Sequence, residues 1–436
     1  MLVVLAVVVL ISPGIIGRIA EQDLEESISR AGVETPEITI STESFDRGWF
    51  SSAGRHRIEL TDRQKFPQMA RFAGSSGYER MPALVLESRI DHGIVPIGSV
   101  TNDEVTLSPG IANLVSTMQL DPGNGELVDL PGRISTTIGL SGETDATLLI
   151  EQGRWTDGGN SIEWQGADLQ FTLDRWGDLT RLEGFVAPLN FRAGYDGFAS
   201  ERIDVSLNHS RSAYELMVGS VHLHSGAVAA TGSFGSNFGY SSLTIDADNH
   251  IDDDRLSGSS SVDIADIGVP GVDAMDFGFD VSFEGLDARS FAALYAALEE
   301  TVADGNPQNA FGAIYPSMDA EIQQFLSAGA QIRFDRLDIA LPQGEIRSNM
   351  SFSLPPSGSS DAFSWPGVLL KLRASFSVQM PEAVFELAQS IQPEIGAAVA
   401  AGFLVKKGDT YKMDIEYAQG LATVNGMPVP VPMPGT

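Results

Sequence analysis

The chain has 436 residues, of which 58 are acidic and 27 are basic, and its formal net charge is −31. This charge argues against nucleic acid as a partner, because the phosphates would be repelled. The sequence contains no cysteine, which excludes disulfides, cysteine-ligated zinc and thiol nucleophiles. The hydrophobic content of 43% is sufficient for a folded core.

Residues 1–17 predict a membrane anchor at the amino terminus. Residues 1–16 carry no charge and are almost entirely apolar, and roughly 17–25 such residues span the core of a bilayer. A cleaved signal peptide would have a basic start and a small-x-small cleavage site, and this segment has neither. We therefore expect an uncleaved signal anchor, with the true start of translation upstream of Met1. Residues 18–32 have helical spacing and predict a helix that connects the anchor to the rest of the chain.

Alternation of apolar and polar residues with a period of two dominates residues 33–285. One clear run of alternating apolar positions consists of Phe277, Phe279, Val281 and Phe283. This alternation is typical of strands that have one apolar and one polar face. Turn signals such as Asp157-Gly158-Gly159-Asn160 separate the runs. We therefore predict an N-terminal region of antiparallel meanders over residues 33–285.

The remaining region, 286–436, mixes helices with strands. Apolar residues at helical spacing predict helices near 288–329 and near 381–402. Period-two alternation predicts two further strands, over 370–378 and 413–417. The fold class predicted for the whole chain is β-dominated α+β. In this prediction an elongated, curved antiparallel sheet with helical insertions follows one N-terminal membrane helix.

The sequence contains no known catalytic, nucleotide-binding or zinc-binding motif. His222 and His224 would lie on one strand face, as a metal-binding pair would, but no third ligand is close in sequence. Two solvent-facing histidines on either side of Leu223 are the simpler interpretation. The acidic run 246–254 has the composition of a calcium loop but lacks its central glycine, so we favour a solvated acidic loop. We predict no catalytic residue, no metal, no cofactor and no enzymatic activity.

Basic residues are concentrated in one segment of this acidic chain. Residues 47–80 contain seven basic and three acidic residues. Because this segment follows closely after the predicted anchor, its cations could contact lipid head groups, each at about 1 kcal/mol. The residues that we predict for such contacts are Arg55, Arg57, Arg63 and Lys65. The alternative is a solvated strand face whose cations form local ion pairs.

Four segments of the sequence carry a resemblance to a known family. The first is Arg47-Gly48-Trp49-Phe50-Ser51-Ser52, and the second is His92-Gly93 followed by Pro96. The third is the stretch 283–288 before a predicted helix, and the fourth runs from Tyr411 to Asn425-Gly426. Together these segments resemble the YdgA-like family of uncharacterised bacterial proteins. They are spread from residue 44 to residue 426, so the resemblance covers nearly the whole chain.

The resemblance implies a single-pass protein of the inner membrane of a Gram-negative bacterium, with the bulk of the chain in the periplasm. It implies no catalytic residues, because the biochemical function of that family is not established. From the residues alone, Asp46-Arg47-Gly48 predicts a turn, after which Trp49 and Phe50 point to opposite faces of the next strand. One of the two would cap the core, and contact with a partner is the alternative for this motif.

Three functional hypotheses follow from the sequence. The first is a non-enzymatic envelope protein, anchored in the inner membrane, that binds a partner, a lipid or an envelope protein, or acts as a scaffold. The second is a lipid-binding or lipid-transfer protein that holds acyl chains in an apolar β groove, by analogy with AsmA-like proteins. The third is a hydrolase whose site has no recognisable motif. The first two differ in whether the apolar faces of the strands close on each other or stay open.

Overall fold

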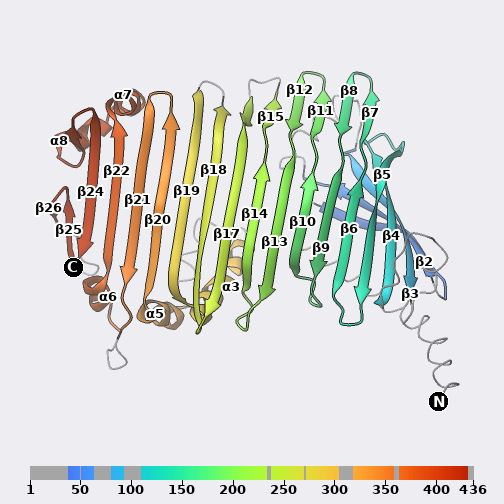
Figure 1. Ribbon diagram of the computed structural model, residues 1–436, viewed down its shortest axis with the longest axis horizontal. Helices are drawn as coiled ribbons and strands as arrows, with labels where there is room; N and C mark the ends of the chain where they lie inside the picture. Colours follow the sequence, from blue (N-terminus) through green and yellow to red (C-terminus); the bar gives the residue numbers. More distant parts are fainter. Residues whose placement is uncertain are drawn as a thin grey trace, which may run out of the picture. The chain divides into compact units, whose positions relative to one another are not determined.

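The computed structural model describes residues 38–49, 51–62, 80–92, 110–232, 237–269, 272–303, 318–357 and 363–430. These residues form mostly antiparallel sheet with few helices, which confirms the β-dominated class (Figure 1). The predicted anchor at 1–17 and the predicted helix at 18–32 lie outside the described residues. Within the described part of the chain, no helix is long and apolar enough to cross a membrane.

The chain divides into two compact units. Unit 1 comprises residues 1–207 and 225–238, and unit 2 comprises residues 208–224 and 239–436. Residue 285, where the sequence predicts a border between two regions, lies within unit 2 in β19 (Val272–Asp287). That border stays a prediction.

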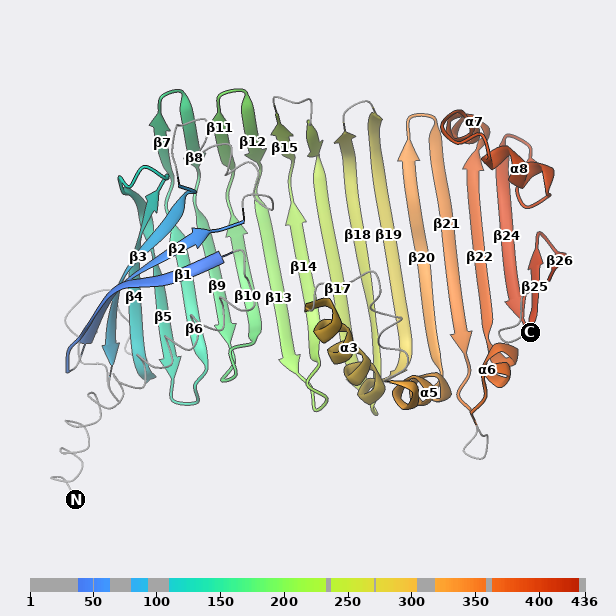
Figure 2. The same cartoon turned by 180° about the vertical axis from the view of Figure 1, so that it is seen from behind.

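Unit 1 contains a long antiparallel ladder. Each strand pairs with the next along the chain from β1 to β6, and the ladder then continues to β9 and β10. Its strands are β1 (Ile38–Arg47), β2 (Ser51–Leu60), β3 (Ala83–His92), β4 (Gly110–Asp121), β5 (Val128–Gly139), β6 (Thr144–Ile150), β9 (Ala167–Leu173) and β10 (Leu179–Val186). Figure 2 shows β1 and β2 crossing one face of the sheet that β5, β6, β9 and β10 form.

A second antiparallel ladder of unit 1 runs in the order β7, β8, β11, β12 and β15. Two-residue breaks separate β8 from β9 and β10 from β11, so the extended chain changes ladder at each break. Pro188 lies in one break and has no N–H to donate to a ladder. Gly166, in the other, has a φ of 116°, which favours glycine. The strands are β7 (Gly153–Asp157), β8 (Asn160–Trp164), β11 (Leu189–Ala193), β12 (Asp196–Ser200) and β15 (Val228–Thr231).

Unit 2 is built on an antiparallel ladder that runs from β17 to β22 and on to β24, β25 and β26. β23 (Val405–Lys407) pairs with the first part of β24. The other strands are β17 (Ser242–Asp252), β18 (Arg255–Val269), β19, β20 (Ala330–Leu341), β21 (Gly344–Leu354), β22 (Arg373–Pro381), β24 (Thr410–Ala418), β25 (Leu421–Val424) and β26 (Met427–Val429). Three strands contain residues of both units, namely β13 (Ile203–Arg211), β14 (Met217–Ser225) and β16 (Phe238–Tyr240).

The helices of unit 2 lie in the connections between its strands. Helices α3 (Ala288–Ala303) and α5 (Asp319–Ala328) follow β19, within the segment 288–329 in which the sequence predicts helix. Helices α7 (Glu382–Ile391) and α8 (Ile395–Ala400) follow β22, within the second such segment. A buried cluster of Leu256, Leu286 and Ala288 packs against Phe291 of α3 and Phe325 of α5. The two helices therefore cover the apolar side of the sheet at this end of its strands (Figure 2).

The strand predicted to begin at residue 370 is wrong over its first residues. Residues Trp365–Lys371 form helix α6, and β22 begins only at Arg373. The side chain of Ser364 accepts a hydrogen bond from the backbone N–H of Gly367 at 3.2 Å, which caps the helix. Pro366 follows in the first turn, where proline favours a helix. These local signals outweigh the short alternation of Leu370 and Leu372.

The solvated loop predicted for the acidic run 246–254 is also wrong. Residues 246–252 belong to β17, and only Asp253 and Asp254 form a turn, each with positive φ. Ile245, Ala247 and Ile251 occupy the apolar side of this strand. The acidic residues alternate with them and lie on its polar side, so the run is one half of an amphipathic strand.

Candidate functional site

The first family-like segment forms the tight turn between β1 and β2. The backbone N–H of Gly48 donates to the carbonyl oxygen of Ser51 at 2.9 Å. A Cβ atom at Gly48 would lie 2.3 Å from that oxygen, so this position requires glycine. Trp49 is 56% exposed, whereas Ser52 is buried. The turn lies where the sequence predicts it, and of the motif's two aromatic residues Trp49 lies at the surface.

Two cations of the predicted head-group patch form ion pairs within unit 1. Arg55 Nε lies 2.8 Å from a carboxylate oxygen of Glu43, and Arg55 Nη1 lies 2.8 Å from one of Glu87. Arg57 Nε contacts Glu59 at 2.5 Å, and its Nη2 contacts Asp121 at 2.5 Å. These are the local ion pairs of the alternative interpretation. Head-group contact by Arg55 and Arg57 stays a prediction.

The pair between Arg57 and Asp121 is the most deeply buried of these contacts. The side chain of Asp121 is 1% exposed and that of Arg57 is 13% exposed. Burial raises the pKa of Asp121, but hydrogen bonds from Arg57 and from the amides of Gly123 and Gly125 outweigh it, and the pKa lies below its usual value. The carboxylate is therefore ionised at neutral pH and stabilises the turn after β4.

Beside this pair, β2 buries a histidine. His56 is 6% exposed, and its Nδ1 lies 3.1 Å from the hydroxyl of Thr42. Its Nε2 is buried and has no hydrogen-bond partner among the described residues. Burial lowers the pKa of His56, so the ring is neutral at pH 7. On the face of the sheet that carries His56, the hydroxyls of Ser88 and Ser116 lie 2.7 Å apart. The buried face of β2, β3 and β4 is therefore partly polar.

For five of the predicted site residues the structure gives only a strand pairing or no description. His92 is the last residue of β3 and pairs with Ala112 of β4. The residues that lie outside the described part of the chain are Phe50, Arg63, Lys65 and Gly93.

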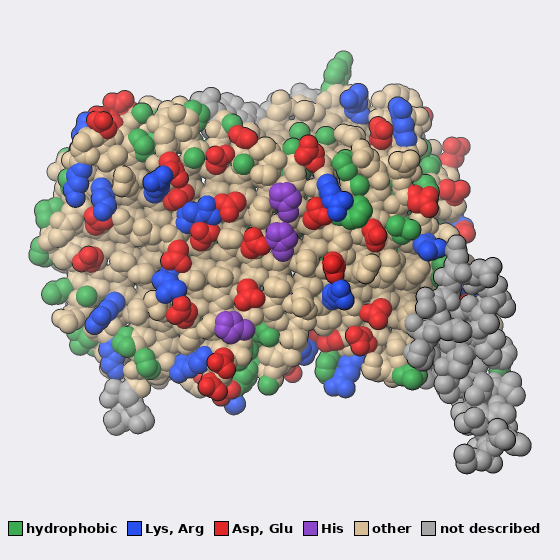
Figure 3. Space-filling view, in the orientation of Figure 1, with side chains coloured by type: hydrophobic (Ala, Val, Ile, Leu, Met, Phe, Trp, Pro, Cys, Tyr) green, Lys and Arg blue, Asp and Glu red, His purple; other side chains and the backbone are tan. Residues whose placement is uncertain are grey.

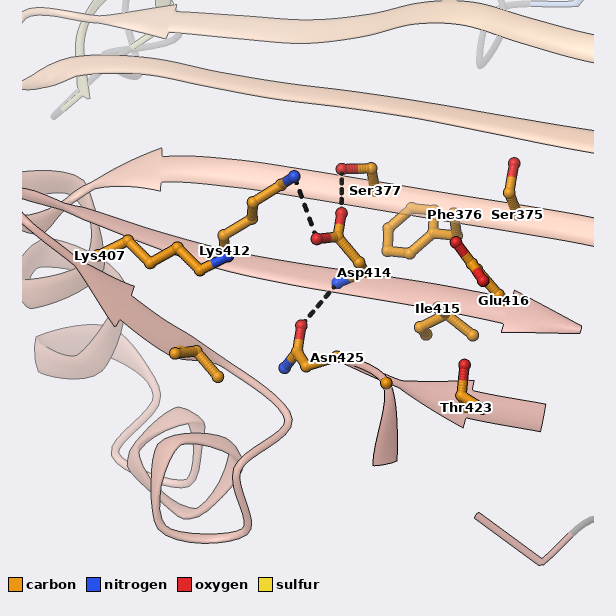
Figure 4. A pocket seen from close by; sticks show the side chains of 12 residues that line it. Ser375, Phe376, Ser377, Lys407, Lys412, Asp414, Ile415, Glu416, Thr423 and Asn425 are labelled. Atoms are coloured by element: carbon orange, nitrogen blue, oxygen red, sulfur yellow. Dashed lines mark hydrogen bonds and ion pairs between the residues drawn. The ribbon is translucent and has the colours of Figure 1, made fainter. Parts of the chain in front are cut away.

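The last family-like segment, in contrast, borders a cavity of about 600 Å³ in unit 2 (Figure 4). Asn425 accepts a hydrogen bond from the backbone N–H of Asp414 at 3.0 Å. Its amide nitrogen donates to the carbonyl oxygens of Gly402 at 2.9 Å and Phe403 at 3.0 Å. Asn425 therefore ties the turn between β25 and β26 to β24 and to the chain before β23. Gly426, with a φ of 78°, completes this turn.

Charged groups of both signs line this cavity. Lys412 Nζ lies 3.0 Å from a carboxylate oxygen of Asp414, and the hydroxyl of Ser377 donates to the same carboxylate at 2.8 Å. Burial raises the pKa of Asp414, but the hydrogen bonds from Ser377 and Lys412 outweigh it and lower that pKa overall. Lys407 lies on the Lys412 side of Asp414, whereas Glu416 lies on the other side (Figure 4). The cavity thus has a cationic end and an anionic end.

The histidine pair of β14 faces solvent, as the simpler interpretation predicts. His222 Nδ1 lies 2.5 Å from a carboxylate oxygen of Asp246, and His224 Nδ1 lies 3.1 Å from the hydroxyl of Thr244. Both histidines are exposed, and Leu223 between them is partly buried. Among the described residues, no group of three or more His, Asp or Glu side chains could hold a metal ion.

Unit 2 also presents an apolar sheet face. One row across neighbouring strands consists of Ile245, Val262, Phe279 and Leu337, each paired with the next. None of the four is buried, and Leu337 is 40% exposed. The adjacent row of Ile264, Phe277, Ile339 and Ile346 is likewise only partly buried. The buried cluster under α3 and α5 lies near one end of these strands, and the central rows lie outside it.

The opposite face of the same strands is polar. Asp263 and Asp280 of neighbouring strands both pair with Arg336, at 2.7 and 2.8 Å. The side chain of Arg333 lies 2.7 Å from Glu284. Figure 3 shows acidic and basic side chains interspersed over this face. The strands of unit 2 are therefore amphipathic, with a hydrated face and a partly exposed apolar face.

Only some of the residues that line the cavity are predicted from the sequence. Sequence reasoning selected Asn425 and Gly426 through the family resemblance, and it missed Ser377, Lys412 and Asp414. One available signal is the distribution of lysine, because four of the five lysines of the chain fall between residues 371 and 412. The cavity itself depends on contacts between β22, β23, β24 and β25, which no local pattern specifies.

Comparison with known proteins identifies the family. The chain belongs to a bacterial protein family of unknown function, DUF945, whose family model matches residues 1–432. No curated protein and no solved structure matches the chain.

Proposed function

We propose that this member of the DUF945 family is a non-enzymatic, membrane-anchored envelope protein that binds the acyl chains of lipids along the apolar face of unit 2. The single observation that carries the proposal is the partly exposed row of Ile245, Val262, Phe279 and Leu337 in the interior of an antiparallel sheet. A sheet with one apolar face normally buries that face against a second layer. In the described part of unit 2, α3 and α5 supply such a layer only near one end of the strands.

An acyl chain fits the chemistry of these rows. Their side chains are hydrocarbon, and the two rows together place Phe277, Phe279 and Leu337 beside one another. Each methylene group that moves from water onto such a surface contributes about 0.8 kcal/mol when it is fully buried. Binding of a chain of ten or more methylene groups would therefore be favoured by several kcal/mol. The entropy that the chain loses when it is immobilised offsets a part of this free energy.

The location belongs to the same proposal. The apolar residues 1–17 favour an uncleaved anchor, and the resemblance to the YdgA-like family favours the inner membrane of a Gram-negative bacterium with the bulk of the chain in the periplasm. We further propose that the strands form an elongated, curved sheet whose concave side holds the lipid. An anchored protein of this kind would meet its ligand at the membrane that holds it.

Binding of a fluorescent long-chain fatty acid to the full-length protein tests the proposal. Leu337→Gln removes an exposed apolar side chain from the central row and should weaken binding about fivefold. Leu140→Gln is the matched control, because Leu140 is 65% exposed in a turn of unit 1 and is not part of the apolar rows of unit 2. The same affinity in both variants and in the unchanged protein would contradict the proposal.

A further inference from the structure

Exposed apolar side chains gather at the last strands of unit 2. Leu370 is 57% exposed, Phe403 40%, Leu421 70% and Met427 46%. A Cβ atom at Gly402 would lie 2.9 Å from the terminal carbon of Met427, which places Met427 beside the residue that precedes Phe403. These four residues, Leu370, Phe403, Leu421 and Met427, are called the edge surface.

Leu370 lies beside Gly420, the residue that precedes Leu421. A Cβ atom at Gly420 would lie 3.3 Å from a methyl carbon of Leu370. The hydroxyl of Tyr417 donates to the carbonyl oxygen of Leu369 at 3.0 Å, which holds α6 against β24. The edge surface is therefore built from α6, the chain before β23, and the first residues of β25 and β26. Single exposed apolar residues are common on proteins, but four on one edge indicate a contact surface.

The cavity of Figure 4 adjoins this edge surface. Asn425 lines the cavity and also holds Phe403 through its carbonyl oxygen, so one side chain joins the two features. Lys407, Lys412 and Glu416 line the cavity from β23 and β24. Ser375 and Thr423 pair with Glu416 on the two neighbouring strands, so their hydroxyl groups lie at the anionic end of the cavity and can bind an oxygen-rich ligand (Figure 4).

The charges of the cavity favour a ligand that carries both signs. Lys407 and Lys412 can bind phosphate oxygens, and Glu416 can bind an ammonium group on the other side of Asp414. Lys412 forms an ion pair with Asp414, whereas Lys407 is exposed and adds positive charge near the Asp414 carboxylate. A purely anionic surface would gain nothing from Glu416 and would be repelled by a chain of net charge −31.

From this arrangement we infer that the edge surface docks on a bilayer of zwitterionic phospholipid, with one phosphate-and-amine head group in the cavity between Lys407 and Glu416. Leu370, Phe403, Leu421 and Met427 then contact the acyl region, and the two lysines contact the phosphate. The inference deepens the proposed function, because it names the class of lipid surface from which unit 2 receives its ligand.

Site-specific labelling tests this contact in the full-length protein. The chain has no cysteine, so Leu421→Cys introduces a single attachment point for an environment-sensitive fluorophore. The protein is reconstituted in vesicles of phosphoethanolamine lipid or of phosphoglycerol lipid. We expect a blue shift of the label at position 421 in phosphoethanolamine vesicles and a smaller shift in phosphoglycerol vesicles. Tyr195→Cys, at a position that is 91% exposed in unit 1, is the control and should show no shift.

Two lysine variants separate the head-group contact from simple apolar adsorption. Lys407→Gln should raise the amount of phosphoethanolamine lipid needed for half of the shift about fivefold. Lys406→Gln is the matched control, because Lys406 is the adjacent residue but pairs with Glu382 outside the cavity, and it should change the titration little. Equal titrations for the two variants would overturn the assignment of the cavity.

Three other outcomes would overturn the inference. No shift at position 421 in any vesicle would exclude contact with lipid. A shift that appears without vesicles and grows with protein concentration would assign the edge surface to a second copy of the chain. Loss of the shift in millimolar inorganic phosphate, with no loss in equal free phosphoethanolamine, would assign the cavity to a free anion. Leu337→Gln is expected to change only the fatty-acid assay and Lys407→Gln only the vesicle assay, so each proposal can fail alone.

Discussion

The strands β2 to β4 of unit 1 and β17 to β20 of unit 2 differ in which side chains they bury and which they expose. The first set buries polar groups, including His56, Ser116 and the carboxylate of Asp121. The second set leaves apolar side chains such as Leu337 partly exposed. Buried polar groups demand specific partners, so they fix one arrangement of strands. An apolar face in contact with water gains free energy when a ligand covers it. The face of β17 to β20 is therefore a better candidate for a ligand surface than the polar interior of β2 to β4.

The largest loss of folding stability is expected when the buried ion pair between Arg57 and Asp121 is broken. Arg57→Ala leaves the carboxylate of Asp121 without its main partner, and removal of one member of a buried pair typically costs about 3–5 kcal/mol. Arg181→Ala is the control, because Arg181 and Glu183 are both about 60% exposed and such pairs contribute at most about 1 kcal/mol. The free energy of unfolding in urea measures both. Equal losses in the two variants would show that the Arg57 pair does not stabilise unit 1.

A smaller effect is expected from the turn that borders the cavity of unit 2. Asn425→Ala removes hydrogen bonds to the backbone of Asp414, Gly402 and Phe403, and we expect a loss of about 1–3 kcal/mol. Asn124→Ala removes only an exposed hydrogen bond to the amide of Glu126 and should cost about 0.5 kcal/mol. Thermal unfolding of the two variants compares them. A destabilisation no larger than that of the Asn124 variant would contradict the role assigned to Asn425.

The pH dependence of stability probes the buried histidine. Burial lowers the folded-state pKa of His56 below 6.5, so below pH 6.5 the unfolded state binds more protons than the folded state. The contribution of His56 is therefore complete above pH 6.5 and is lost as the pH falls toward the folded-state pKa. Burial also lowers the pKa of His209, which adds a change of the same sign.

Urea titrations between pH 7.5 and pH 5 measure this change in stability. We expect His56→Gln to flatten the loss of stability with falling pH, without removing the part that His209 contributes. His250→Gln is the control, because its side chain is 65% exposed. An unchanged slope in the His56 variant would contradict a neutral, buried ring at this position.

The smallest expected effect concerns the stability of the apolar face. Leu337→Gln should change the free energy of unfolding by no more than about 0.5 kcal/mol, because the side chain is 40% exposed. Val85→Ala in unit 1 should cost about 1–3 kcal/mol, because Val85 is completely buried. Chemical denaturation distinguishes the two. A large loss for Leu337→Gln would mean that the apolar face is part of a closed core.

The strands were the most predictable part of this molecule, and the cavity was the least. Alternation such as that of Phe277 and Phe279 reports directly on the two faces of a strand, and these residues lie in β19. The same signal failed at Leu370, where Ser364 and Pro366 start a helix. The pairing of Arg57 with Asp121 joins residues 64 positions apart, and that of Asn425 with Gly402 joins residues 23 positions apart. Such contacts depend on strand register, which a local pattern does not contain.

The most direct test of the proposed function is an experimental structure of the full-length protein extracted from its native membrane without delipidation. The account predicts elongated density of an acyl chain along Phe279 and Leu337, on the apolar face of unit 2. A structure in which protein atoms cover these side chains and no such density is present would contradict it.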